Sequence, residues 1–270
     1  MHSLYVADSM TARPSSLPVQ VGQNAPIDLF FEKEARGWTN RYLSRTYQQR
    51  RNLVLSVVFE ELSKTRKKGA EYRALDFGCG AGVFVGALST MGISVTGVDR
   101  SRAMIEAAQS RLRARSHTEF ELLRDGSRND GAYRQRSYDL VLCLSVLEFV
   151  VSPEEIIAQL AALLAADGLL ILTVPNRNSY LRRFERFAFD HPSFNRWLPG
   201  LNHLALQDCY LRHQTQQFTA EELVHSTKRL GLEVEQHRFH VAPTLCAPIE
   251  KLEKVGMMML LSFRKRIHTG

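Results

Sequence analysis

Residues 74–85 read ALDFGCGAGVFV, and in this stretch Gly78, Gly80 and Gly82 stand at alternate positions directly after an apolar run. Glycines at such a turn let a ligand approach bare backbone. The series is not a dinucleotide fingerprint, because Val83 occupies the place of that motif's third glycine. No Lys-Ser or Lys-Thr pair follows, which excludes a P-loop. The stretch therefore predicts a strand, a ligand-binding turn and a helix, with a ligand of another kind.

Strand-like and helix-like segments alternate along most of the chain. Short apolar runs typical of strands occupy residues 73–77, 94–99, 119–124, 138–144, 169–174, 233–241 and 257–263. Helical spacing of apolar residues separates several of them, as over residues 82–91 and 101–113. This alternation predicts an α/β fold with a doubly wound, mostly parallel sheet and helices on both faces.

Two short signatures mark where later helices begin. Residues 152–155 (SPEE) and 219–222 (TAEE) each place a hydroxyl side chain three positions before a glutamate, which is typical of a capping box. Pro153 suits the first helical position. Gly168 and Gly231 are expected to end the two helices.

The chain divides into a tail, a helical segment and a large α/β domain. Residues 1–26 are polar and interrupted by prolines, which predicts a flexible N-terminal tail. Apolar residues recur at helical spacing within residues 27–70. Residues 71–270 hold the alternating segments, interrupted at 177–218 by a long stretch rich in aromatic residues. Because such stretches rarely serve as passive loops, we expect a substrate cap there.

Three carboxylates stand near the glycine turn and the ends of the next two strands. Asp76 lies two residues before Gly78, where its charge suits an ammonium group and disfavours a pyrophosphate. Asp99 ends the second strand and can accept hydrogen bonds from both hydroxyls of a ribose. Asp125 follows the third strand, placed to receive an adenine amino group. A ligand with an ammonium end, a ribose and an adenine but no phosphate is S-adenosylmethionine, which we expect as the cofactor.

The runs DFGCGAG, VTGVD, YDLVLCLSVLEF and LLILTVPN resemble the motifs of class I S-adenosylmethionine-dependent methyltransferases. The resemblance covers roughly residues 72–265 and looks closest to the small-molecule branch that includes the ubiquinone-biosynthesis O-methyltransferases. It implies a Rossmann-like seven-stranded sheet with an antiparallel last strand, and an N-terminal helical lid over the cofactor at residues 27–70. The chain departs from many relatives at Phe149, where they have a histidine, so that histidine's role cannot be carried over.

The resemblance also implies which residues hold the cofactor. Asp76 would lie near the methionine amino group, the three glycines would line the methionine and ribose, and Asp99 would bind the ribose hydroxyls. Asp125 and Gly126 would face the adenine, and Leu144 and Ser145 would border the cofactor from the fourth strand. The full implied set is Asp76, Gly78, Gly80, Gly82, Asp99, Arg100, Asp125, Gly126, Leu144 and Ser145.

Methyl transfer to a hydroxyl requires an aligned acceptor and removal of the acceptor's proton. Histidine has a suitable pKa, and the leading candidate for the base is His213, just before the cap returns to the domain. His191 and His203 lie in the same cap and are alternatives. Glu148 is interpreted as a structural residue rather than a base. Arg50 reaches either an anionic substrate or solvent.

The sequence thus predicts a methyltransferase whose partner is a small-molecule acceptor, with a hydroxyl as the expected target. Two alternatives stay open. A nucleic-acid methyltransferase is favoured by the net charge of +7, but the sequence LSVL stands where amino-methylating enzymes of nucleic acids have N/D-P-P-Y/F. The basic excess also lies outside residues 71–175, which hold 10 Lys/Arg and 13 Asp/Glu. The other alternative is a cofactor-binding protein without catalysis.

Membrane and metal signals are weak along the chain. No apolar run approaches the roughly 18 residues of a membrane span, and residues 1–16 lack the apolar core of a signal peptide, which predicts a cytoplasmic protein. Residues 181–197 mix Arg and Phe, so a peripheral membrane contact stays open. Cys79, Cys143, Cys209 and Cys246 show no paired spacing, so we expect neither a disulfide framework nor a metal site. The oligomeric state is unknown from the sequence.

Overall fold

The computed structural model describes residues 25–64, 72–123, 131–191, 193, 210–240 and 253–266. The α-helices in these ranges are α1 (Ala25–Glu34), α2 (Arg45–Lys64), α3 (Val83–Ser89), α4 (Arg102–Leu112), α5 (Pro153–Leu163), α6 (Tyr180–Asp190) and α8 (Ala220–Lys228). Short 3-10 helices are η1 (Ala35–Leu43), η2 (Ala132–Gln135), η3 (Leu147–Phe149) and η5 (Tyr210–Arg212). The strands are β1 (Arg73–Phe77), β2 (Ser94–Asp99), β3 (Thr118–Leu122), β4 (Tyr138–Leu144), β5 (Leu164–Pro175), β6 (Leu232–His240) and β7 (Met258–Lys265).

The seven strands form one sheet in the order β3-β2-β1-β4-β5-β7-β6. The pairs β2–β3, β1–β2, β1–β4 and β4–β5 are parallel, and β7 runs antiparallel to both β5 and β6. The α/β class, the seven strands and the antiparallel last strand are therefore confirmed. The order reverses direction at β1, whose neighbours are β2 and β4, and ligands of open α/β sheets bind at such a point.

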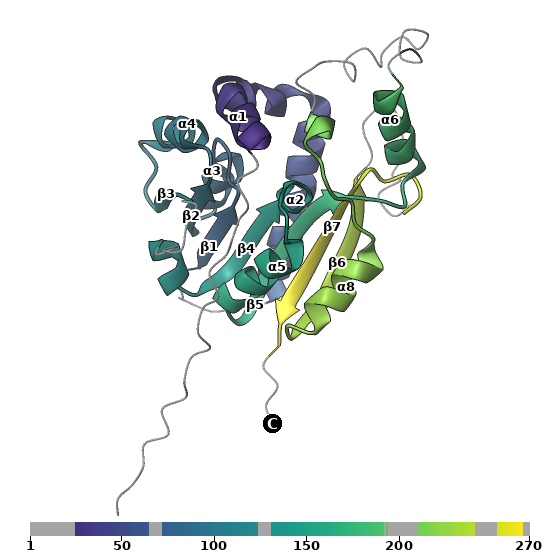
Figure 1. The fold of residues 1–270 in the computed structure, drawn as a ribbon. Helices are drawn as coiled ribbons and strands as arrows, with labels where there is room; N and C mark the ends of the chain where they lie inside the picture. The colour runs from purple at the N-terminus through teal and green to yellow at the C-terminus, as the bar shows by residue number, and fades with distance from the viewer. Residues whose placement is uncertain are drawn as a thin grey trace, which may run out of the picture.

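Two apolar layers cover the two faces of the sheet. Because successive residues of a strand point to opposite faces, Leu140 and Leu142 of β4 pack against the layer of α2, α3 and α4. Val141 and Cys143 face the other layer, which α5 and α8 supply (Figure 1). Burial on both faces explains why these strands read as nearly continuous apolar runs.

One expected helix differs from the structure. Ser152 precedes α5, but its side chain makes no capping hydrogen bond, so the predicted capping box at 152–155 is wrong. The helix also ends at Leu163 rather than at Gly168, which lies inside β5. A Cβ on Gly168 would lie 3.0 Å from the Tyr138 carbonyl of β4, so this glycine allows two backbones to approach closely. The second box is confirmed, with Thr219 Oγ1 accepting from the Glu222 amide at 3.2 Å.

The N-terminal helices are fixed to the sheet at two places. Arg264 of β7 donates to Glu61 Oε2 of α2 at 2.8 Å, and both side chains are buried. On the other side, α1 packs against α4 and lies beyond the carboxyl-terminal ends of the parallel strands (Figure 1). Helices α1 and η1 therefore sit over the edge of the sheet where a ligand would bind. Within the described ranges, no helix has the length and apolar character needed to cross a membrane.

Candidate functional site

A cavity of about 960 Å³ opens at the carboxyl-terminal ends of β1, β2 and β4. Helices α1, η1 and α2 form one wall, and η3, α6 and the adjoining ends of β6 and β7 form the opposite one. Pockets for drug-sized ligands measure about 300–1,000 Å³. The cavity therefore has room for one large ligand or for two smaller ones side by side.

The turn after β1 presents bare backbone to this cavity. Gly78 and Gly80 line it and have positive φ angles of 77° and 52°. The amides of Gly78 and Cys79 both donate to the Val98 carbonyl, at 2.8 and 3.0 Å, which ties the turn to β2. A Cβ on Gly80 would lie 3.0 Å from Trp38 Nε1 of η1. Conformation and space together thus require glycine at this position.

Gly82 has a different place from the one implied by the resemblance. It is the N-cap of α3, has a φ of 72° and does not line the cavity. A Cβ there would lie 3.0 Å from Ala108 Cβ and 3.3 Å from Leu112 Cδ1 of α4. This glycine lets α3 pack against α4, and its backbone does not face the cavity.

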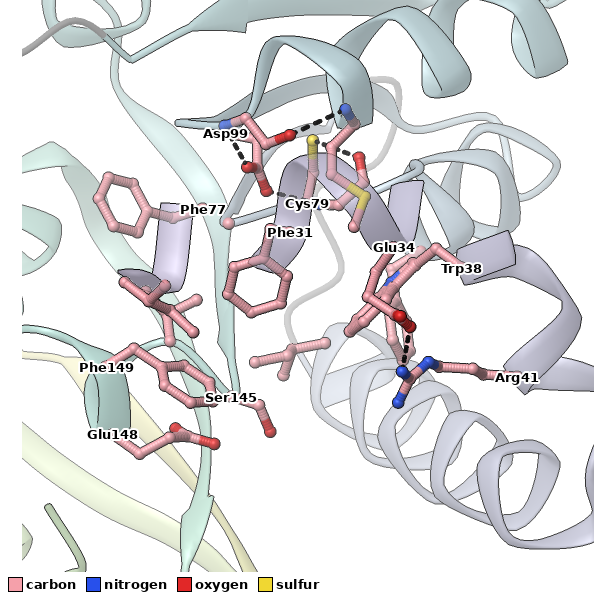
Figure 2. A pocket seen from close by; sticks show the side chains of 18 of the residues that line it. Phe31, Glu34, Trp38, Arg41, Phe77, Cys79, Asp99, Ser145, Glu148 and Phe149 are labelled. Atoms are coloured by element: carbon pink, nitrogen blue, oxygen red, sulfur yellow. Dashed lines mark hydrogen bonds and ion pairs between the residues drawn. The ribbon is translucent and has the colours of Figure 1, made fainter. Parts of the chain in front are cut away.

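Asp99 joins the glycine turn to the start of α4. Its Oδ2 accepts from the Gly80 amide at 2.8 Å and its Oδ1 from the Ser101 amide at 2.9 Å (Figure 2). Burial raises the pKa of Asp99, and these backbone hydrogen bonds oppose that shift. Arg100 also lines the cavity and forms an ion pair with Asp28 of α1 at 3.0 Å.

Asp76 is a buried carboxyl group that faces the cavity. Only 2% of its surface is exposed, and within the described part of the chain its Oδ2 has no hydrogen-bond partner. Burial, with the charge of Asp99 as a smaller cause, raises the pKa of Asp76 to about 7. A cation bound beside this group would offset its burial and restore the ionised form.

The N-terminal helices close one side of the cavity with aromatic rings. The Phe31 ring of α1 lies 5.5 Å from the Trp38 ring and 5.7 Å from the Phe149 ring of η3. Figure 2 shows Phe31 between the Asp99 end and the Phe149 end of the cavity. Glu32 accepts from the Ala103 amide of α4 at 3.2 Å and helps to hold α1 in this position.

Ser145, with a φ of 56°, follows β4 and lines the cavity beside Leu144. Arg50 of α2 reaches it, donating from Nη2 to Ser145 Oγ at 2.8 Å and to Thr173 Oγ1 at 2.9 Å. Its Nε is buried and, like the rest of the guanidinium, has no carboxylate partner among the described residues. This guanidinium is a site for an anionic group of a ligand.

Glu148 lies at the end of the cavity away from Asp99 (Figure 2). Gln214 and His240 are further polar residues of the cavity lining, as are Arg182 and Glu185 of α6. Burial raises the pKa of Glu148 to about 7, opposed by the charges of Arg50 and Arg182. Burial and the charge of Arg50 lower the pKa of His240 to about 4, so this imidazole is neutral at pH 7. Glu148 gives the cavity a second polar end, separate from Asp99.

Other predicted site residues lie elsewhere. The His213 ring packs 5.3 Å from the Phe30 ring of α1, and His213 is not among the residues that line the cavity. The exposed His191 ring stacks on Phe187 at 4.3 Å. His203, Asp125 and Gly126 lie outside the described residues.

Comparisons with known proteins agree with this geometry. A profile of the methyltransferase domain family matches residues 45–237, most of the chain. The chain belongs to the class I S-adenosylmethionine-dependent methyltransferases. It is 30% identical over 158 residues to a ubiquinone biosynthesis O-methyltransferase of Vibrio parahaemolyticus, covering 57% of this chain and 65% of that protein. It is 34% identical over 113 residues to the Saccharophagus degradans protein of the same name, covering 42% and 48%. The matches thus span about half to two thirds of these relatives' length.

Solved structures share the fold of this methyltransferase. The magnesium protoporphyrin IX methyltransferase of Synechocystis PCC 6803, crystallised with bound SAH, has a TM-score of 0.62 at 16% identity, covering 90% of this chain and all of that one. A Thermotoga maritima protein described as a possible histamine N-methyltransferase has a TM-score of 0.53 at 19% identity, covering 88% and 99%. The predicted family and its cofactor, S-adenosylmethionine, are confirmed.

Several residues that line the cavity, among them Arg50, Glu148, Gln214 and His240, are not among the cofactor-binding or catalytic residues that the sequence predicts. For Arg50 the sequence shows only a positive charge in a helical segment, which does not identify its partner. For Glu148 the sequence favours a structural role. Gln214 and His240 carried no signal, because nothing in the sequence shows that residues so far apart meet at one cavity. The sequence offers one clue to these residues: the acidic Glu148 directly follows the short apolar run LSVL.

Proposed function

We propose that this methyltransferase transfers the methyl group of S-adenosylmethionine to a hydroxyl group of a small molecule. The observation that carries the proposal is the single cavity with two polar ends, the glycine turn with Asp99 at one and Glu148 at the other. When bound, the cofactor supplies a methyl group on a sulfonium, from which a neutral thioether departs readily as the leaving group. The chain's task is then to align an acceptor and to receive its proton.

The residues at the first end fit the cofactor. Asp99 is fixed by two backbone amides and lines the cavity, so its remaining lone pairs suit ribose hydroxyls. Gly78 and Gly80 leave space for the ligand to lie against the turn, and Leu144 borders the same space. Arg100 lines the cavity beside Asp99. We propose no contact with the cofactor for Gly82, which faces α4.

The amino-acid part of the cofactor carries both signs of charge, and the cavity offers a complement to each. Asp76, whose Oδ2 has no partner among the described residues, suits the ammonium group. Arg50, held by Ser145 and Thr173, suits the carboxylate. Asp76, Arg50 and Tyr42 line the same cavity, and the charges of the first two act on the Tyr42 hydroxyl. We therefore assign Arg50 to the cofactor and not, as one reading of the sequence had it, to the substrate.

The experiment incubates the protein with radiolabelled S-adenosylmethionine and separate panels of phenols, sugars, lipids and RNA or DNA oligonucleotides. Calorimetry measures cofactor affinity in parallel. We expect micromolar cofactor binding and label in a small hydroxyl compound, with the O-methyl product identified by mass spectrometry. Label in the oligonucleotides alone would support a nucleic-acid methyltransferase instead. Cofactor binding with no label in any panel would support a binding protein without catalysis.

A further inference from the structure

Three polar side chains that line the cavity have buried atoms without hydrogen-bond partners in the described part of the chain. They are Oε2 of Glu148, both amide atoms of Gln214 and Nε2 of His240. Glu148 is 3% exposed and Gln214 6% exposed, and all three residues line the cavity. Unsatisfied polar atoms are rare in protein interiors and call for a physical explanation.

These side chains come from segments far apart in the sequence. Glu148 lies in η3, Gln214 follows η5, and His240 is the last residue of β6. The Thr215 amide and hydroxyl donate to the Glu148 carbonyl at 3.0 and 3.1 Å, which fixes the segment of Gln214 against η3. Main-chain contacts thus hold Gln214 beside Glu148, and all three residues line one cavity. Within the described residues, each of the three keeps at least one side-chain atom without a hydrogen-bond partner.

We propose that Glu148, Gln214 and His240 bind the methyl acceptor and that Glu148 is the catalytic residue that removes its proton. This inference rests on the proposed function. In the step, the acceptor O–H bond breaks and its proton passes to Glu148 Oε2. The acceptor oxygen forms a bond to the methyl carbon as the sulfur–carbon bond breaks, and the electron pair of that bond stays on sulfur. The products are a methyl ether, a neutral thioether and a protonated Glu148.

The surroundings of Glu148 suit this role better than those of the other candidates. A base acts best when its pKa lies near the working pH, and Glu148 has a pKa of about 7. His240 is too weak a base because its pKa is about 4. Asp76 lies beside Asp99, whose charge contributes to its raised pKa, and so belongs to the cofactor end. His213 does not line the cavity.

The charged and titratable groups around Glu148 keep its carboxylate available at neutral pH. Arg50 from α2 and Arg182 from α6 favour its ionised form, as does the hydroxyl of Ser145 after β4. Among the described residues, Cys143 of β4 is a further titratable neighbour, and burial raises its pKa well above the usual value, so it stays a neutral thiol. In Figure 2 the Glu148 carboxylate points toward Ser145.

The same groups specify the kind of acceptor. Gln214 offers both a donor and an acceptor, and the neutral His240 offers Nε2 as either. Phe31 and Phe149 add apolar walls. The expected acceptor therefore has an apolar body and carries, besides the reacting hydroxyl, a further group able to donate and accept hydrogen bonds.

The test compares Glu148→Gln with wild type on every compound that wild type methylates in the small-molecule panels. We expect the variant to keep its cofactor affinity and melting temperature while kcat falls by about 10²–10⁴-fold. The wild-type kcat should rise with pH up to about 7 and then level, because the ionised carboxylate is the base. Glu148→Asp should recover part of the activity and keep the ionisation. Glu154→Gln, at an exposed acid of α5, is the matched control and should behave as wild type.

Two further variants test binding of the acceptor. Gln214→Leu and His240→Leu should each raise KM about tenfold or more, with a smaller change in kcat, because each removes hydrogen bonds to the acceptor. A folded Glu148→Gln enzyme with unchanged kcat and pH profile would overturn the inference while leaving the proposed function in place. A wild-type protein that binds the cofactor and methylates no small molecule would overturn both.

Discussion

The two ends of the cavity are built in different ways. At the cofactor end, Asp99 has both oxygens bonded to backbone amides of Gly80 and Ser101, all within one strand–turn–helix segment and its neighbouring strand. At the proposed acceptor end, Glu148, Gln214 and His240 come from distant segments and keep atoms that have no partner among the described residues. The cofactor end is thus held in place by residues close together in the sequence, without a ligand. The acceptor end depends on contacts between distant parts of the chain.

Asp76 is the exception that makes the comparison informative. It lies near Asp99 at the cofactor end, yet within the described part of the chain its Oδ2 has no partner, like the groups of the acceptor end. Whether a polar group already has a hydrogen-bond partner therefore depends on which atom of the ligand it would contact, and not on the end of the cavity at which it lies. In the proposed binding mode, the ribose hydroxyls meet Asp99, which backbone amides already hold in position. The ammonium group meets Asp76 and supplies the partner that Asp76 Oδ2 lacks among the described residues.

The largest effect is expected from blocking the cofactor end. Gly80→Val should lower S-adenosylmethionine affinity by more than about 100-fold, because the side chain would enter the space between the turn and Trp38. Gly92→Val is the matched control, since Gly92 also has a positive φ, of 79°, but has open space around it. Both variants carry similar backbone strain, and calorimetry should find cofactor binding lost in the first alone. Equal affinity in the two variants would contradict the role of the turn.

A smaller effect is expected from removing the ribose partner. Asp99→Ala should weaken cofactor binding by about 1.5–3 kcal/mol, the range for a hydrogen bond to a charged group. Asp139→Ala is the control, because Asp139 also accepts a backbone amide, that of Arg73 at 3.0 Å, but at the beginning of its strand. Unchanged affinity in a folded Asp99→Ala protein would remove Asp99 from the site.

The contrast between the two ends also explains what the sequence could predict. The strands over residues 73–77, 94–99 and 138–144 were predicted with the bounds that the structure has, because they are buried on both faces and sit next to clear turns. Gly80 and Asp99 lie in one local motif, and both line the cavity as expected. Gly82 has the φ of a turn glycine, but which neighbour it faces depends on α4, and sequence spacing cannot show that.

The acceptor end escaped prediction for the same reason. His240 ends a strand that is adjacent to β7 and not to its predecessor in the chain, so its position depends on the strand order. Glu148 follows the apolar run LSVL, which gives no sign of its role. Its burial and its Oε2, which has no partner among the described residues, distinguish it from a structural glutamate. The expected end of a helix at Gly168 failed because a close approach between β4 and β5 requires glycine there.

A moderate effect should accompany the titration of Asp76. Its pKa of about 7 in the free protein means that it is largely protonated below that pH. A ligand ammonium group binds the ionised form better, so cofactor affinity should rise by up to about tenfold per pH unit as the pH approaches 7, and then level. Asp76→Asn should weaken binding and flatten this dependence, whereas Glu148→Gln should retain it. Calorimetry between about pH 5.5 and 8.5 makes the measurement, and a wild-type affinity independent of pH would refute the assignment.

The smallest effect is expected from His213, and it sharpens the comparison most directly. Its ring packs on Phe30 of α1 and is not part of the cavity lining, so we expect it to affect catalysis through the position of the N-terminal helices. His213→Ala should therefore change kcat by less than about threefold, against the hundredfold or greater loss expected for Glu148→Gln. The pH profile should keep its ionisation near 7, since that ionisation belongs to Glu148. His213→Phe separates packing from protonation, because it keeps a ring against Phe30 without a titratable nitrogen. A large loss of kcat in both His213 variants, with an altered pH profile, would identify His213 rather than Glu148 as the base and would overturn the assignment of the acceptor end to Glu148.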